Sequence, residues 1–99
     1  MLALRPGCET CNADLPPESE NAVICSYECT FCSDCASTLL RNTCPNCGGE
    51  LVRRPVRPQA RLVNSPASKE RVYLPLVGDR LVRHAALVEQ YRGVLPMKR

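Results

Sequence analysis

The chain has 99 residues, eight of them cysteines, with no tryptophan, one phenylalanine and a formal net charge of +3. No apolar run approaches the roughly 20 residues that a membrane-spanning helix needs, which excludes a protein embedded in a bilayer. The first residues also lack the apolar run of a secretory signal. We therefore expect a cytoplasmic protein whose thiols stay reduced and free to bind metal.

The first half of the chain is poor in large apolar residues, and a small domain with so little core needs disulfides, a metal or a partner in order to fold. All eight cysteines lie between residues 8 and 47. Cross-links at these cysteines therefore replace the missing core. Metal ligation is the interpretation that fits a reducing compartment, while a disulfide framework is the alternative that an export route without a leader would allow.

The cysteines form four pairs, three with CxxC spacing and one with CxxxC spacing: Cys8 and Cys11, Cys25 and Cys29, Cys32 and Cys35, Cys44 and Cys47. Two pairs supply the thiolates of one tetrahedral Zn²⁺ site, so four pairs predict two sites. Pro45 and Gly48 suit a tight turn around the last pair. Because eight cysteines close both sites, we expect two structural Zn²⁺ ions and no enzyme activity. Iron–sulfur ligation and a redox-active dithiol are the alternatives, although the latter expects a βαβ unit that this sequence lacks.

The spacing of the four pairs admits a sequential and a crossed arrangement. The run CSYECTFCSDC followed by CPNC resembles the core of a RING finger, with Cys29 where the usual RING finger has histidine. A LIM-like sequential pairing is similar in the middle but expects a longer gap between Cys35 and Cys44. The RING resemblance implies a small metal-stabilised α+β fold of the treble-clef, cross-brace type. It assigns the first and third pairs to site 1 (Cys8, Cys11, Cys32, Cys35) and the second and fourth pairs to site 2 (Cys25, Cys29, Cys44, Cys47).

The elements expected within residues 1–52 follow the order of a RING finger. Val23, Ile24 and Phe31 predict a short hairpin, with Phe31 a core residue between the two sites. Ser33 or Asp34 is suited to cap a helix that continues to Arg41. We therefore expect residues 1–52 to form one two-zinc module.

A second resemblance covers more of the chain. The opening MLALRPGCETCNADLPPES, the cysteine block, GGELVRRPVRP and SPASKERVY are similar to a family of short bacterial proteins described as domain of unknown function 1272. The likeness runs from Met1 to about Tyr73. It implies a bacterial cytosolic zinc protein and implies no particular activity.

Charge divides the chain in two: residues 1–50 hold two basic and seven acidic residues, whereas residues 51–99 hold eleven basic and three acidic ones. Residues 53–71 form a basic linker in which Pro55 and Pro58 favour extended chain over helix. Four arginines of this arm are candidates to contact the phosphates of a nucleic acid: Arg53, Arg54, Arg57 and Arg61. The thiolates of a loaded module add negative charge beside them, and no aromatic residues are interleaved for base stacking. We therefore favour an arm that packs on its own acidic module or is solvated.

Residues 72–99 are expected to end in a helix over about 79–92, begun by Asp79 as N-cap and ended before Gly93. Its apolar face is predicted to contain Leu81, Val82, Ala85, Val88 and Tyr91. This face can pack on the zinc module, on another protein or on a second copy of the chain as a homodimer. His84, the single histidine, is expected on the helix surface and not as a metal ligand.

Together these features predict a non-enzymatic zinc protein that binds another protein, with the metal supplying only rigidity. A RING-type ubiquitin-ligase-like adaptor is the second hypothesis, because RING fingers recruit a conjugating enzyme. Against it, Glu9 and Thr10 stand inside the first pair where ligases usually carry an aliphatic residue, and Gly48 stands where they often carry a basic one. Binding of nucleic acid by the basic arm is the third hypothesis.

Overall fold

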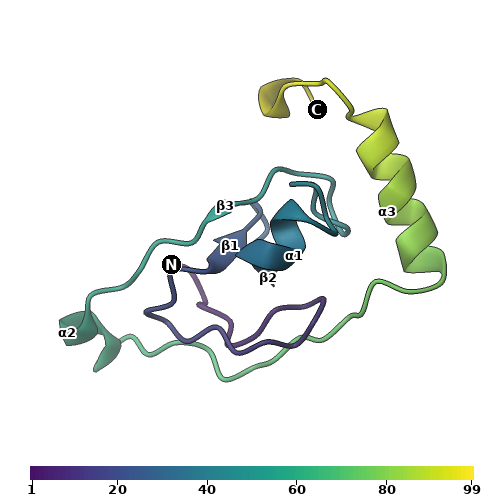
Figure 1. The fold of residues 1–99 in the computed structure, drawn as a ribbon. Coiled ribbons are helices and arrows are strands. Elements are labelled where there is room, and N and C mark those ends of the chain that lie inside the picture. The colour runs from purple at the N-terminus through teal and green to yellow at the C-terminus, as the bar shows by residue number, and fades with distance from the viewer.

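The computed structural model describes residues 1–99, and its centre is a small antiparallel sheet (Figure 1). The strands are β1 (Ala22–Ile24), β2 (Thr30–Cys32) and β3 (Val52–Arg53), in the order β2-β1-β3. β1 and β2 form a hairpin in which Val23 pairs with Phe31, and Arg53 pairs with Val23 from the other side. The hairpin predicted from the sequence is therefore confirmed, and the turn that joins its strands carries the second cysteine pair.

Helix α1 (Ser33–Ser37) follows β2 directly and is shorter than the sequence predicted. Its N-cap is Cys32, whose sulfur accepts a hydrogen bond from the Cys35 amide at 3.4 Å, so the prediction of Ser33 or Asp34 as the cap is wrong. The helix also does not continue to Arg41. Arg41 and Asn42 have φ values of +50° and +56°, which no right-handed helix contains. This reversal of the chain brings Cys44 next to Cys25 in the turn of the hairpin.

The hydrophobic core is small and contains much sulfur. Eleven buried residues form one cluster, and four of them are the cysteines Cys8, Cys25, Cys29 and Cys44. Phe31 and Leu40 are fully buried within the cluster, which confirms the prediction that Phe31 is a core residue. A core of this size gives a domain little stability by apolar burial alone.

The basic segment after β3 lies against the N-terminal residues. The Arg54 amide donates to Ala22 O at 2.8 Å, and a short helix, α2 (Gln59–Leu62), follows Pro58. α2 was not expected from the sequence, although the fixed φ of proline suits the start of a helix. Beyond α2 the chain returns in extended form, with the Ser68 amide bonded to Ala3 O at 2.8 Å. The arm thus packs on its own module, while the division of the chain at residues 52 and 71 stays a prediction.

Helix α3 (Asp79–Gln90) stands at one end of the module, where the sequence predicted a helix over about 79–92 (Figure 1). Its N-cap is Gly78, with φ +57°, and no side chain caps it, so Asp79 is the first helical residue and not the cap. Gly93, with φ +71°, lies just beyond its end. The helix therefore begins directly after a glycine of positive φ, and a second such glycine lies three residues beyond its last residue, Gln90.

The face that α3 turns to the module is only partly the predicted one, since Val88 and Tyr91 are half-buried but the rest of that face is exposed. Leu81 and Val82 are 45% and 69% exposed, whereas His84 is only 3% exposed. His84 Nε2 lies 3.0 Å from Leu40 O and 3.1 Å from Thr43 O. Because a carbonyl only accepts, this nitrogen carries the hydrogen and donates it. The expectation of a surface His84 is therefore wrong: the residues that follow α1 present two carbonyls to the helix, that of Leu40, which also accepts from the Thr43 amide, and that of Thr43, and a polar side chain meets them better than an apolar one.

The chain ends in a 3₁₀ helix, η1 (Pro96–Lys98), which returns toward the last cysteine pair. Arg99 Nη1 donates to Gly48 O at 3.0 Å, and its guanidinium lies 5.4 Å from the centroid of the Tyr91 ring. None of the helices has the length and the apolar character needed to cross a bilayer.

Candidate metal centres

The first cluster consists of Cys8, Cys11, Cys32 and Cys35, whose four sulfur atoms all lie within 4.8 Å of one another. Cys8 and Cys11 flank a turn in which the Asn12 amide donates to Cys8 O at 2.9 Å. Cys32 ends β2, and Cys35 lies in the first turn of α1. The cluster thus joins an N-terminal turn to the junction between the hairpin and α1.

The pKa values of three thiols of the first cluster are shifted, two upward and one downward. Burial raises the pKa of Cys32 and that of Cys35, and neighbouring sulfurs raise the Cys35 pKa further. Cys8 differs: burial acts to raise its pKa, but hydrogen bonds from the backbone at Cys11, Cys32 and Thr10 bring it below the usual value. Four thiolates this close together require a cation to offset their charge.

The second cluster consists of Cys25, Cys44 and Cys47, whose sulfur atoms also lie within 4.8 Å of one another. Cys25 follows β1 in the turn of the hairpin. Cys44 and Cys47 lie on a tight knuckle in which the Gly48 amide donates to Cys44 O at 2.8 Å and the Gly49 amide donates to the Cys47 sulfur at 3.3 Å. Gly48 has φ +77°, the backbone freedom that its place after the fourth pair was expected to need.

Cys29 lies beside the second cluster but is not one of its three mutually close thiols. Its sulfur is hydrogen-bonded to the Cys44 thiol and accepts a hydrogen bond from Asn46 Nδ2 at 3.4 Å. The bond with Cys44 lowers the pKa of Cys29 to about 6; burial opposes this change and Asn46 reinforces it. Burial raises the pKa of Cys25 to about 11, and the bond to Cys29 together with burial raises that of Cys44. Cys29 is therefore the acidic thiol of this region.

The grouping of the thiols is crossed and not sequential. The first pair meets the third, and the fourth pair meets Cys25 of the second. All eight cysteines are free thiols. The structure thus contains one group of four cysteines and one group of three, each of which could hold a metal ion.

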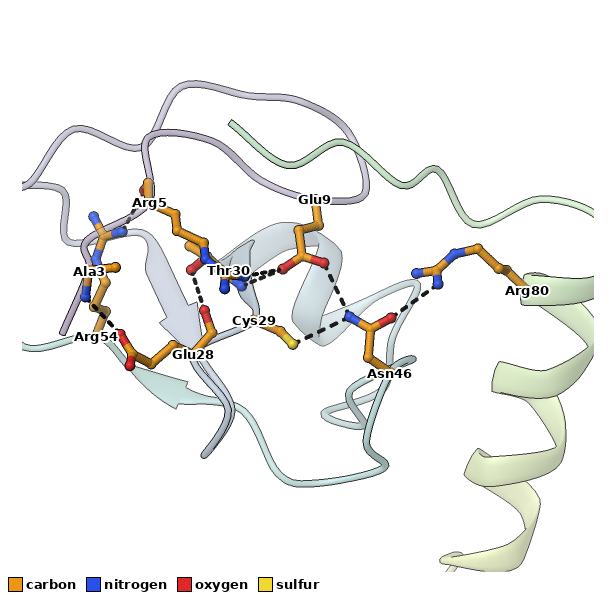
Figure 2. A network of polar contacts seen from close by, with 9 residues as sticks. All are labelled: Ala3, Arg5, Glu9, Glu28, Cys29, Thr30, Asn46, Arg54 and Arg80. Carbon is orange, nitrogen blue, oxygen red and sulfur yellow. Dashed lines mark hydrogen bonds and ion pairs between the residues drawn. The ribbon is translucent and has the colours of Figure 1, made fainter. Parts of the chain in front are cut away.

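A buried carboxylate connects the two cysteine regions (Figure 2). Glu9, between the ligands of the first pair, is 1% exposed. Its Oε2 accepts hydrogen bonds from Arg5 Nη1 at 3.2 Å and from the Thr30 amide at 3.1 Å. Its Oε1 accepts one from Asn46 Nδ2 at 3.1 Å. This role of Glu9 was not predicted: in the sequence it stood out only as a departure from RING ligases, although a charged residue between two paired cysteines was the available signal.

The four arginines proposed as phosphate contacts are not equivalent. Arg54 is 1% exposed and donates to the carbonyls of Arg5, Leu15 and Pro16 at 2.8 to 3.2 Å. Burial lowers its pKa. Arg57 donates to Ser65 O at 2.8 Å and to Leu2 O. Only Arg53 and Arg61 are exposed. The expectation that Arg54 could contact phosphate is wrong, because its guanidinium joins the N-terminal segment to β3.

Comparison with known proteins gives a family match over residues 1–57, to the family described as protein of unknown function DUF1272. The chain belongs to this family. An uncharacterized protein of Rhizobium meliloti (strain 1021) is 64% identical over 75 residues, which are 76% of this chain and 89% of that relative. No solved structure matches the chain significantly. The family resemblance seen in the sequence is therefore confirmed.

The DUF1272 match contains all eight cysteines together with Glu9, Asn46 and Arg54, and it ends before α2 and α3. Both cysteine clusters thus lie within the matched part of the chain. α3, with Arg80 and His84, lies outside the match.

Proposed function

We propose that this protein binds two structural Zn²⁺ ions in a RING-like, treble-clef cross-brace and acts in the cytoplasm as a non-enzymatic module that binds another protein. The observation that carries the proposal is the crossed gathering of the thiols into two groups. Crossed ligation ties together segments that are distant along the chain. It thereby stabilises a domain whose apolar core is too small to do so.

The donor atoms fit zinc. Thiolate sulfur in groups of four is the ligand set of structural Zn²⁺ sites. Cys8, Cys11, Cys32 and Cys35 would hold the first ion. Cys25, Cys44 and Cys47 would hold the second ion. Cys29, whose thiol lies beside that of Cys44 and interacts with it by hydrogen bonding, would be the fourth ligand.

The absence of catalysis is part of the proposal, because four thiolates leave a zinc ion no position for water or substrate. The metal then supplies rigidity only. The function then depends on binding at the surface. Several large apolar side chains on and before α3 are exposed there: Tyr73, Leu74, Val77, Leu81 and Val82. Exposed apolar residues gathered in one segment favour a protein partner.

The two other hypotheses have less support. Nucleic-acid binding through the arm loses Arg54 and Arg57, whose guanidinium groups are occupied by carbonyls of the same chain. For the ligase hypothesis, Glu9 is buried in a hydrogen-bond network where ligases usually present an aliphatic residue. Gly48 follows the last cysteine and offers no basic side chain.

The metal claim is tested by elemental analysis and native mass spectrometry of protein purified under reducing conditions. Two zinc ions per chain are expected. Fewer than two, or iron in place of zinc, would contradict the proposal.

The interaction claim is tested by cross-linking and mass spectrometry in the native bacterium. A partner should be captured by the wild type and lost with the double variant Leu81→Glu, Val82→Glu on α3. The matched control is Gln59→Glu with Ala60→Glu on α2, which adds the same charge at exposed positions and should retain the partner. Equal capture by both variants would contradict an interaction through α3.

A further inference from the structure

Asn46 lies in the knuckle between Cys44 and Cys47, and its side-chain amide makes three hydrogen bonds (Figure 2). Its oxygen accepts from Arg80 Nη1 at 3.0 Å, and its nitrogen donates to Glu9 Oε1 at 3.1 Å and to the Cys29 sulfur at 3.4 Å. The orientation of the amide is unambiguous, because a guanidinium only donates and an ionised carboxylate only accepts. One N–H of Asn46 is therefore directed at Cys29.

Arg80, in the first turn of α3, brings a positive charge to this network without a carboxylate partner of its own. It takes part in none of the three ion pairs of the structure, and its Nε and Nη2 atoms are shielded from solvent with no hydrogen-bond partner. A shielded guanidinium is costly unless negative charge lies nearby. Its one hydrogen bond leads through Asn46 to two such groups, Glu9 and Cys29.

Glu9 already has a cationic partner in Arg5, so its charge is offset before Arg80 is considered. The remaining source of negative charge is the second cluster, because four thiolates around one Zn²⁺ carry a net negative charge. We propose that Asn46 is a positioning residue of the second cluster. It orients Cys29 as the fourth ligand and links it to Arg80, so that metal binding and the docking of α3 stabilise each other. This inference rests on the proposed function, since it requires a metal at that cluster.

The coupling acts mainly on the second cluster, although Asn46 also bonds Glu9 in the turn of the first. α3 otherwise contacts the module through His84, which binds the carbonyls of Leu40 and Thr43, and through Leu87 and Tyr91 next to Gly48. All of these contacts involve residues 40–48, which carry the fourth cysteine pair. No residue of α3 is hydrogen-bonded to the segments 8–12 and 32–35 that form the first cluster. By thermodynamic linkage, the free energy by which docked α3 strengthens binding of the second metal ion equals the free energy by which that ion strengthens the docking of α3.

The test measures the two zinc ions separately by competition with a chromogenic chelator, with Cys47→Ser identifying the ion of the second cluster. Asn46 is exposed, so its variants should fold. Asn46→Ala is expected to weaken the second ion about 10- to 100-fold, the usual effect of removing a hydrogen bond to a metal ligand. The first ion should change less, because Glu9 loses a hydrogen bond there but no cysteine of the first cluster does. Asn46→Asp keeps the shape and the oxygen that Arg80 needs but turns a negative oxygen toward Cys29 and Glu9. It should therefore weaken the second ion more than Asn46→Ala does. Asn64→Ala, at an exposed loop asparagine, is the control.

Absorption spectra of the Co²⁺-substituted protein give a measurement that a general loss of stability would not change. Charge-transfer absorption between sulfur and Co²⁺ grows with the number of thiolate ligands, so Asn46→Ala should reduce this absorption at the second cluster only. Arg80→Met and Arg83→Met remove the same charge from the same helix, but Arg83 makes no hydrogen bond to Asn46, whereas Arg80 does. Only Arg80→Met should weaken the second ion and speed hydrogen exchange of the α3 amides.

The outcomes separate this inference from the proposed function. If the wild type binds two zinc ions and Asn46→Ala and Arg80→Met hold the second ion as tightly as it does, the coupling is wrong and the proposed function stands. If Asn46→Asp binds the second ion as well as the wild type, Asn46 does not position Cys29. Equal effects of Arg80→Met and Arg83→Met would mean that only the net charge of α3 matters, and would overturn the proposed coupling through Asn46. A wild type without metal overturns both.

Discussion

The two cysteine clusters have the same donor atoms but different surroundings. The first gathers four thiols from an N-terminal turn and from the junction of β2 with α1, and one of these thiols, Cys11, is exposed. The second gathers three thiols with Cys29 beside them, and Cys25, Cys29 and Cys44 are all buried. Residues 40–48, which carry part of the second cluster, are also the residues that α3 contacts. Two similar sets of cysteines can therefore differ in what surrounds them: the first lies within residues 8–35, whereas the segment that carries part of the second is also packed against a helix distant in the sequence.

The largest effect should come from removing metal from both clusters. Four of the eleven core residues are cysteines, so loss of metal leaves buried thiols without a cross-link and a core too small to persist. Treatment with a strong chelator is expected to abolish the cooperative thermal transition seen by circular dichroism, and added Zn²⁺ should restore it. A transition that survives complete removal of metal would show that the clusters do not hold the fold.

Single-ligand substitutions should separate the clusters. Cys44→Ser replaces a fully buried thiol of the core, whereas Cys11→Ser replaces an exposed one. We expect Cys44→Ser to lose the second ion and unfold the chain, and Cys11→Ser to weaken the first ion while the chain stays folded. Native mass spectrometry counts the ions, and the dispersion of amide resonances reports the fold. The reverse order would mean that the first cluster, and not the second, is the centre of the structure.

His84→Ala should separate α3 from the second cluster. The variant leaves the carbonyl of Thr43 without a donor, leaves that of Leu40 with the Thr43 amide alone, and opens a space under α3, which together cost about 3 kcal/mol of unfolding free energy. Val82→Ala, on the exposed side of the same helix, is the control and should cost less than about 0.5 kcal/mol. Chemical denaturation of the zinc-loaded proteins measures both. Similar values for the two would mean that α3 is not docked through His84.

The same comparison explains what the sequence could predict. The hairpin and the buried position of Phe31 follow from local pattern, because short apolar runs next to paired cysteines leave few alternatives. The crossed grouping came from resemblance to a RING finger, since spacing alone allowed two arrangements.

The face of α3 could not be predicted in this way. Periodicity selected Leu81 and Val82, but the surface that receives the helix offers backbone carbonyls, and His84 meets them. The prediction that Arg54 contacts phosphate failed for a related reason. A basic run in the sequence indicates exposed side chains, whereas three carbonyls of the N-terminal segment bind this one. Both errors arise where a polar group is buried by partners that are distant in sequence.

The smallest predicted effect concerns two glycines near the second cluster and isolates the contact between the knuckle and α3. Gly48 and Gly93 both have positive φ, +77° and +71°, so alanine is strained at each by about 1 kcal/mol. A Cβ at Gly48 would also lie 2.9 Å from Tyr91 Cε2 and 3.5 Å from Leu87 Cδ2, whereas a Cβ at Gly93 meets nothing within 4 Å. Tyr91 cannot yield without loosening the end of α3, so Gly48→Ala should cost about 2 kcal/mol and Gly93→Ala about half as much. Denaturation midpoints of the zinc-loaded variants measure the difference. Equal costs would mean that the end of α3 does not press on the knuckle, and the second cluster would then be as local as the first.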